Sequence, residues 1–260
     1  LKDLKYKISG DIPVVYSAYD ADGEPLELGI SKNKDTVTEK LKTNGREIKY
    51  PIKIDPTLTI QGSGKDTKIV KNAATTNYGS NTFFTISNHS TATNRSLVSM
   101  SISALPAGAT ISSALFSMYH YRTAYGGNPN TKIVTLTRVV REDWEEAQAT
   151  WNIYKTSNNW GTAGCANTTT DIDTSLTATD TFTGTATGWM EFDVYDIVAY
   201  AYANSLTFNV IGTTDYTADF PEFYSKEYGT DTSLRPKLVI EYTEATPLPV
   251  FMNYYQNIMR

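Results

Sequence analysis

The sequence predicts an all-β protein, an antiparallel jelly-roll sandwich with a small β unit at its N-terminus and one short helix. With 260 residues the chain is long enough for one large β domain and a smaller one. Its 18 tyrosines and low charged content of 20% are typical of secreted β proteins rather than of disordered or helical ones. Short alternating segments, separated by Gly, Pro and Asn, recur along most of the chain.

Residues 1–56 are predicted to form the small N-terminal β unit. The segments "LKYKIS", "VVYSAYDADGEPLELGI" and "EIKYPIKID" alternate apolar and polar residues and are broken by turns. The stretch "DADGEP" lacks the remainder of a calcium loop, and Asp-Gly pairs favour hairpin turns, so we interpret it as a turn. Pro56 is expected to end the last strand, because proline interrupts a strand ladder.

Residues 57–244 are predicted to form the jelly roll. Many short strands between turns are typical of antiparallel sandwiches. The segment 194–204, "VYDIVAYAYAN", is the one expected helix, because Val194, Ile197, Val198 and Ala201 recur at helical spacing. The expected strands are "TLTIQGS", "FFTIS", "RSLVSMSI", "ISSALFSMYHY", "TKIVTLTRVV", "WMEFDV", "SLTFNVIG", "EFYSKE" and "PKLVIEYT".

Residues 245–260 form an apolar tail behind two prolines. A patch of this kind is a liability in water, which suggests that it docks on another chain. Packing of the tail on its own domain remains the alternative. The candidate assembly residues are Phe251, Tyr254, Tyr255 and Ile258.

Composition excludes several functions. A net charge of −5 argues against nucleic-acid binding, which usually requires clustered Lys and Arg. The single cysteine, Cys165, rules out an intrachain disulfide framework. No apolar run reaches the length needed to span a bilayer. The first residue is Leu1 without a leader pattern, so we expect that a leader was removed or that the sequence is a fragment.

Five blocks between Asp66 and Tyr242 carry a family resemblance. They read "DTKIVKNAATTNYGS", "LPAGATISSALFSMY", "TRVVREDWEEAQATWNIYKTSNNWGTAG", "GWMEFDVYDIV" and "FYSKEYGTDTSLRPKLVIEY". In this order they resemble the DNRLRE family, also called disaggregatase-related domains, of extracellular and virion-associated proteins. The resemblance implies a jelly-roll module, which binds carbohydrate in several relatives. The stretch "RSLVSMSIS" lacks the aromatic residue and the acid usual there, so no role of that acid is carried over.

The resemblance also suggests where a sugar would bind. Trp144 and Trp151 match its "W.E...TWN" phrase and are expected to pin a long loop onto the sandwich, since tryptophan buries a large ring. The family register turns Ala114, Phe116 and Met118 inward. The opposite face of that strand then presents aromatic residues, either to a glycan or to the underside of the tryptophan loop. The carbohydrate-binding candidates are Trp160, Tyr119, Tyr121 and Tyr125.

Two further kinds of site are candidates. Asp171 and Asp173 lie in "TTTDIDTS", which we expect to be a loop, and oxygen ligands of this kind suit calcium, although turns favour Asp equally. Asn88, Asn94 and Asn167 head Asn-x-Ser/Thr triplets and are candidate glycosylation sites.

Catalytic chemistry has weak support. The acids Glu142, Asp143, Glu145 and Glu146 are interpreted as a solvated turn rather than as a glycosidase pair. His89 and His120 are not arranged with a nucleophile, and Cys165 is expected to be a structural thiol. We therefore predict no catalytic residues, and no cofactor except for the candidate calcium.

The sequence thus favours a non-enzymatic extracellular, cell-surface or virion protein that assembles with copies of itself or with other surface or virion proteins. The alternative is a carbohydrate-binding module attached to a cell-surface or phage protein, with glycans as partners. Cleavage of a polysaccharide is the least favoured reading.

Overall fold

The computed structural model describes residues 4–7, 14–19, 25–33, 36–42, 53–124, 131–183, 186–215, 217 and 220–243. These residues divide into two compact units. One contains the described residues up to Leu58 together with 105–112 and 241–243, and the other contains 59–104 and 113–240. Each unit is described by itself.

The first unit is an antiparallel sheet with the strand order β1-β4-β3-β2-β5. Tyr16 on β2 pairs with Pro56 on β5, so β5 continues through the proline that was expected to end it. A strand tolerates proline where the missing N–H would point away from its neighbour, which corrects that expectation. The strands are β1 (Leu4–Lys7), β2 (Val14–Tyr19), β3 (Pro25–Asn33), β4 (Thr36–Lys42) and β5 (Lys53–Gln61).

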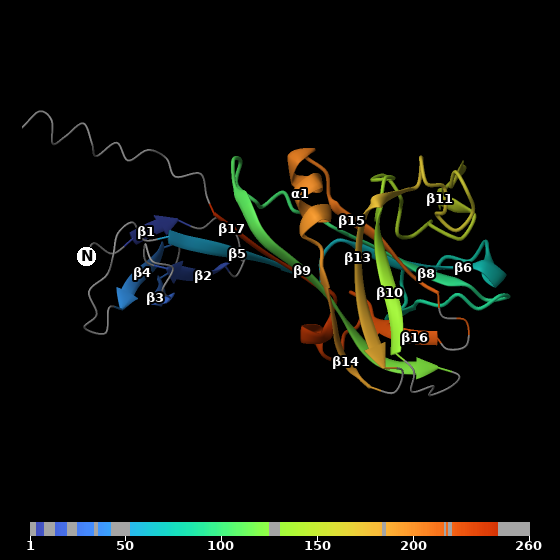
Figure 1. Ribbon diagram of the computed structural model, residues 1–260, viewed down its shortest axis with the longest axis horizontal. Coiled ribbons are helices and arrows are strands. Elements are labelled where there is room, and N and C mark those ends of the chain that lie inside the picture. The colour runs from blue at the N-terminus through green and yellow to red at the C-terminus, as the bar shows by residue number, and fades with distance from the viewer. Residues whose placement is uncertain are drawn as a thin grey trace, which may run out of the picture. The chain divides into compact units, whose positions relative to one another are not determined.

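The second unit is a sandwich of two antiparallel sheets (Figure 1). The first sheet has the order β17-β9-β16-β7, with β14 also paired to β9, and the second has the order β13-β10-β15-β8-β6. The strands of the first sheet are β7 (Phe83–Thr85), β9 (Thr110–Ala124), β14 (Gly188–Asp193), β16 (Phe220–Tyr224) and β17 (Lys237–Thr243). The strands of the second sheet are β6 (Lys65–Val70), β8 (Asn94–Met100), β10 (Thr131–Val139), β13 (Ile172–Thr183) and β15 (Phe208–Thr214).

Apolar side chains from the inner faces of the two sheets form the core. Phe116 on β9 contacts Phe192 on β14 within its own sheet and Phe208 on β15 across the sandwich, at ring distances of 6.5 and 5.2 Å. Ala114, Phe116 and Met118 are all buried, as the strand register predicts. The prediction of an antiparallel all-β sandwich with one short helix is confirmed.

The expected helix is also present. The helix α1 runs from Tyr195 to Ala203 and buries Ile197, Val198 and Ala201, the face that its spacing predicts. The other short elements are a pair of strands, β11 (Ile153–Lys155) and β12 (Asn158–Asn159), and two 3₁₀ turns, Lys71–Ala73 and Thr232–Leu234. Within the described part of the chain, no helix has the length and apolar character needed to cross a membrane.

Two strands of the second sheet were not expected from the sequence. The strand β13 begins at Ile172, where we expected a loop, and β6 occupies residues 65–70. Both lie at the ends of the strand order, so each has one neighbour in that sheet. An edge strand of this kind needs little apolar alternation, and β13 is instead rich in β-branched threonine, which favours strands.

Candidate functional site

A row of aromatic side chains occupies the outer face of the β9 sheet. Because side chains alternate along a strand, Tyr119 and Tyr121 point away from the core that Phe116 and Met118 enter. Tyr224 on β16 pairs with Phe83 on β7, so both lie on one face. All the rings are half-buried. We call this set the aromatic face: Phe83, Tyr119, Tyr121, Trp189, Tyr224 and Tyr228.

The rings of the aromatic face are in direct contact, with Tyr224 at the centre. Its ring is nearly parallel to those of Tyr121, Tyr119 and Tyr228, at centroid distances of 4.5, 5.9 and 3.6 Å. Trp189 meets Tyr119 edge-on at 5.4 Å, and Phe83 meets Tyr121 edge-on at 6.1 Å. The contacts hold the rings as one continuous surface, because few rotamers are compatible with so many neighbours.

Three cations lie against this surface. Lys237 Nζ is 4.3 Å from the ring centre of Trp189, and Lys68 Nζ is 4.5 Å from that of Phe83. The Arg122 guanidinium is 5.4 Å from the ring of Tyr121. Such cation–π contacts add attraction between the charge and the ring face. The charge of Arg122 is paired with Glu222, so the positive charge at the rim of the aromatic face comes from Lys68 and Lys237.

The hydroxyl groups supply hydrogen bonds. Tyr121 donates its hydroxyl to Glu222 Oε2 at 2.6 Å, and burial together with this bond raises the pKa of Tyr121. The pKa of Tyr224 is raised to about 12 by its hydrogen bond with Tyr228 and by burial. Both phenols therefore stay neutral near pH 7 and retain a hydroxyl proton. Apolar ring faces beside neutral hydroxyls match the mixed apolar and hydroxyl surface of a sugar.

Comparison with known proteins decides the class of module. The family model described as carbohydrate-binding module family 96 matches residues 59–242. The chain belongs to this family. No curated protein matches the chain.

The family assignment corrects the DNRLRE resemblance, which was wrong. The blocks that suggested it consist largely of core strands and of the tryptophan loop. Trp144, Phe116 and Phe192, for instance, are fully buried. Residues of this kind report on the packing of a sandwich, and sandwiches of different families share such packing.

The family 96 module brings together only part of the predicted sugar site. Tyr119 and Tyr121 lie side by side in the aromatic face, whereas Tyr125 lies outside the described residues. Sequence reasoning missed the other four members of the aromatic face, Phe83, Trp189, Tyr224 and Tyr228. A signal for Tyr224 was present in "EFYSKE", where it follows the buried Phe223, but nothing in the sequence shows that β16 pairs with β9.

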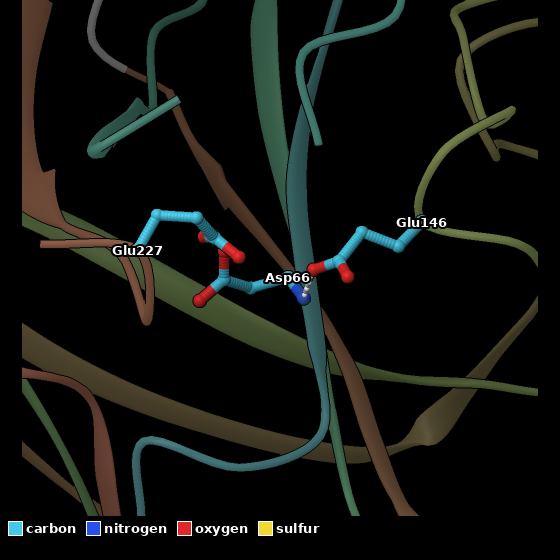
Figure 2. A group of neighbouring side chains, drawn as sticks. All are labelled: Asp66, Glu146 and Glu227. Carbon is cyan, nitrogen blue, oxygen red and sulfur yellow. Dashed lines mark hydrogen bonds between the residues drawn. The ribbon is translucent and has the colours of Figure 1, made fainter. Parts of the chain in front are cut away.

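Of the acids in the predicted solvated turn, Asp143 and Glu145 are exposed, whereas Glu146 has structural partners. Glu146 approaches Asp66 and Glu227 so that one oxygen of each lies within 4.8 Å of the others, the one such group among the described residues (Figure 2). Glu146 accepts the main-chain N–H of Asp66 at 2.7 Å. Lys226 Nζ contacts Glu146 and Glu227, which supplies counter-charge inside the group. Burial raises the pKa of Asp66.

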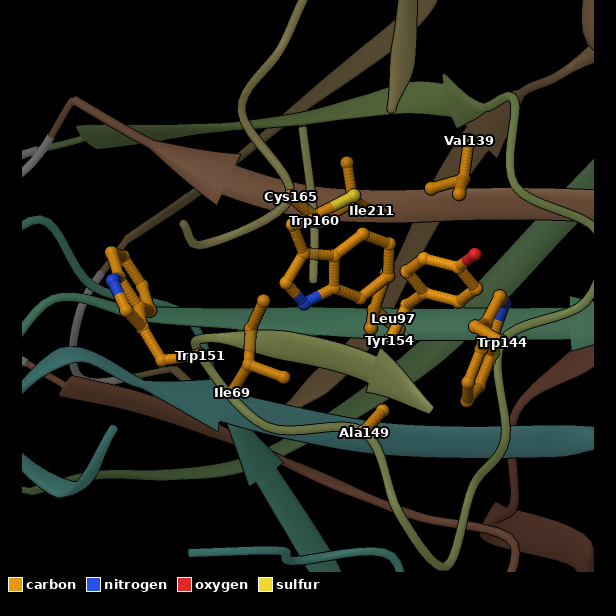
Figure 3. Close-up of a cluster of buried hydrophobic side chains, with 10 residues drawn as sticks. All are labelled: Ile69, Leu97, Val139, Trp144, Ala149, Trp151, Tyr154, Trp160, Cys165 and Ile211. Atoms are coloured by element: carbon orange, nitrogen blue, oxygen red, sulfur yellow. The ribbon is translucent and has the colours of Figure 1, made fainter. Parts of the chain in front are cut away.

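Three of the 4 tryptophans, Trp144, Trp151 and Trp160, lie in a buried cluster (Figure 3). They belong to the Trp loop, residues 140–171, which connects β10 to β13. Trp144 is fully buried and donates its indole N–H to Asn209 on β15 at 2.9 Å. Trp151 is also buried, which confirms that both residues pin the loop.

Trp160 belongs to the same cluster. Its ring is 4% exposed, packs on Tyr154 at 5.5 Å, and donates its N–H to the carbonyl of Thr150 at 2.9 Å. The polar residues around it in the sequence suggested an exposed ring. In this conformation the ring has little surface for a sugar, so the aromatic face is the stronger candidate site.

The two candidate calcium ligands, Asp171 and Asp173, have different partners. Asp171 is fully buried and accepts main-chain N–H groups of Gly161, Thr162 and Asn167 at 2.8, 3.0 and 3.1 Å. Asp173 lies on β13 rather than in a loop, and its carboxylate is 4.0 Å from the guanidinium of Arg138. Calcium binding stays a prediction.

The remaining candidates differ in accessibility. Asn88 is exposed, but Asn94 is buried and donates its amide to Ser87 and to the carbonyl of Ala92. Asn167 is half-buried and its side-chain oxygen accepts two main-chain N–H groups. Cys165 is fully buried, which raises the pKa of its thiol. The tail residues Phe251, Tyr254, Tyr255 and Ile258 lie outside the described residues.

Proposed function

We propose that the chain is a non-catalytic module that binds a polysaccharide across the aromatic face. The stacking of Tyr224 against Tyr119, Tyr121 and Tyr228 carries this proposal, because it creates one continuous ring surface. Membership of carbohydrate-binding module family 96 supports it. Rings stacked in this way offer their edges and their uncovered faces as apolar contact to the C–H groups of sugars, and the phenol hydroxyls offer hydrogen bonds.

The shape of the surface favours a chain of sugars over a single one. Five rings follow one another at centroid distances between 4.5 and 6.1 Å, in the order Trp189, Tyr119, Tyr224, Tyr121 and Phe83. A ligand that spans several rings gains contact area from each of them. The positive charges of Lys68 and Lys237 at the rim make acidic polysaccharides candidates alongside neutral ones.

A polysaccharide ligand fits a protein outside the cell or on a surface. The family match favours this binding role over the assembly role that the apolar tail suggested. Attachment of the module to a larger surface protein is part of the proposal. Assembly through the tail stays a prediction, since the tail lies outside the described residues.

Electrophoresis of the native protein through gels that contain one polysaccharide each tests the proposal. Neutral glucans, mannans and xylans and acidic uronans form a suitable panel. We expect at least one gel to retard the protein, and Tyr224→Ala to weaken this retardation at least about tenfold, or about 1.4 kcal/mol.

Tyr195→Ala is the matched control. Tyr195 is 41% exposed on α1 and lies outside the aromatic face. Its removal should leave the retardation unchanged. Equal retardation of the wild type and the Tyr224→Ala protein by every polysaccharide that binds would show that the aromatic face is not the site.

A further inference from the structure

A second concave site lies on the other sheet of the sandwich. A cavity of about 260 Å³ opens where the Trp loop meets β8 and β15. Its apolar wall includes Ile172 and Ile211, and its polar wall includes Asn88, Thr213 and Arg95. Pockets for drug-sized ligands begin at about 300 Å³, so this volume suits one small ring rather than a polymer.

Arg95 is the one charged residue that lines this cavity. It donates Nη1 to the carbonyl of Gly164 at 2.6 Å, and its guanidinium lies 5.3 Å from the ring of Trp151. Both contacts fix the guanidinium in place. Arg95 is half-buried, and this burial lowers the pKa of its guanidinium.

The charge of Arg95 has no matching carboxylate in the cavity wall. The other described residues that line it are neutral, and the nearby Asp171 carboxylate acts on Cys165 in the wall. The carbonyl of Gly164 uses only one of the five N–H donors of a guanidinium. Arg95 is half-buried, and a guanidinium with further donors pairs well with a planar or tetrahedral oxyanion, through two parallel hydrogen bonds.

We propose that this cavity is a second binding site, which takes a single sugar unit carrying a carboxylate or sulfate group. The oxyanion pairs with Arg95, and the sugar ring lies against Ile172 and Ile211. Asn88 and Thr213 supply polar groups to the cavity wall for the ring hydroxyls, the Thr213 hydroxyl also donating to the carbonyl of Thr135. The site would hold an acidic chain end or side branch. It rests on the proposed function only for the choice of a sugar as ligand.

The cavity and the aromatic face lie on opposite sides of the sandwich. On β15, Phe208 and Val210 point into the core, and alternation therefore turns Ile211 and Thr213 outward. The aromatic face is the outer side of the other sheet. A variant at one site is thus separated by the whole core from the other site, and the two can be tested independently.

Calorimetric titration of the intact chain with monosaccharides tests the second site. The probes are glucuronate and glucose 6-sulfate, with glucose as the neutral match and acetate and sulfate as free anions. We expect both acidic sugars to bind at least tenfold more tightly than glucose and than either free anion.

Asn88→Trp should abolish this binding by filling the mouth of the cavity, because Asn88 is exposed and its replacement costs little packing. Arg95→Met should weaken it at least tenfold, if circular dichroism shows that the variant is folded. Tyr224→Ala should leave it unchanged. Loss of binding in Tyr224→Ala but not in Asn88→Trp would overturn the proposal, since the acidic sugars would then bind at the aromatic face.

Two other outcomes would also overturn it. Equal affinity for glucose and glucuronate would show that Arg95 does not select an oxyanion. Free sulfate or acetate that binds as tightly as the acidic sugars would show a simple anion site without sugar contacts. If a polysaccharide still retards the Asn88→Trp protein, the aromatic face remains supported as the polysaccharide site, whatever the titrations show. The two proposals can therefore fail separately.

Discussion

Asp171 organises the Trp loop from within. Its carboxylate accepts the N–H groups of Gly161, Thr162 and Asn167, and the residue is fully buried. Without that carboxylate, these donors are left without their present acceptor, at a cost of about 1–3 kcal/mol for each one that stays buried and unsatisfied.

We therefore expect Asp171→Ala to lower the free energy of unfolding by about 3 kcal/mol. Asp171→Asn keeps one acceptor oxygen and should cost less. Urea unfolding of the three proteins measures the difference. Equal stability of the wild type and Asp171→Ala would contradict the role of this carboxylate.

The buried carboxyl of Asp66 gives a prediction about pH. Burial raises its pKa above the ordinary value of 3.8, with a further rise from Glu227 and Glu146 and an opposing effect of Lys226. The folded state therefore keeps the proton to higher pH than the unfolded state does. The contribution of protonated Asp66 to stability is complete below its pKa in the unfolded state. It is lost as the pH rises through its higher pKa in the folded state.

Asp66→Asn cannot lose a proton, and its amide oxygen can still accept the N–H of Lys226 that Asp66 accepts. We expect the urea midpoint of the variant, relative to the wild type, to be higher at about pH 7 than at about pH 4. A difference that is the same at both values would show that Asp66 ionises in the folded state as easily as in the unfolded one.

Single residues also show where prediction from the sequence stops. Asp171 suggested a metal ligand because the sequence displays the carboxylate but not its partners. Those partners are main-chain N–H groups of residues 161–167, which every residue type except proline provides. The buried position of Trp160 escaped prediction for a related reason, because its polar neighbours in the sequence are not its neighbours in the fold.

At the scale of elements, we expect the buried side chains of the Trp loop to contribute to stability as those of the sandwich core do. Trp160→Ala should lower the free energy of unfolding by about 3–5 kcal/mol, as is usual when a large buried side chain is truncated. Trp189→Ala, on the half-exposed aromatic face, should cost clearly less while weakening polysaccharide binding. Thermal unfolding and gel retardation of both variants check the contrast. A stable Trp160→Ala protein would contradict the burial of this ring.

The strands explain why only part of the aromatic face could be predicted. Alternation along one strand places Tyr119 and Tyr121 on the same face, so their pairing follows from local sequence. Tyr224 is about a hundred residues away and joins them only because β16 pairs with β9. Likewise, β13 carries too little apolar alternation to stand out from a polar loop. The local sequence pattern predicts strands that have a buried face, but it does not show which strands pair with each other.

At the scale of the whole molecule, the apolar tail still predicts assembly. Deletion of residues 247–260 should leave a folded protein that binds polysaccharide as before, because the family match ends at residue 242. If the tail docks on another chain, the deletion should also convert an oligomer to a monomer in light scattering. A monomeric full-length chain would contradict the assembly role and leave the binding role intact.

The central claim is that a polysaccharide covers the aromatic face, and tryptophan fluorescence tests it directly. Three of the 4 tryptophans are buried in the Trp loop, and Trp189 on the aromatic face is the half-exposed one. Acrylamide quenching should therefore report mainly on Trp189. We expect a polysaccharide that retards the protein to reduce this quenching, and Trp189→Phe to remove most of the quenchable signal. Unchanged quenching at saturating polysaccharide would show that the ligand binds elsewhere.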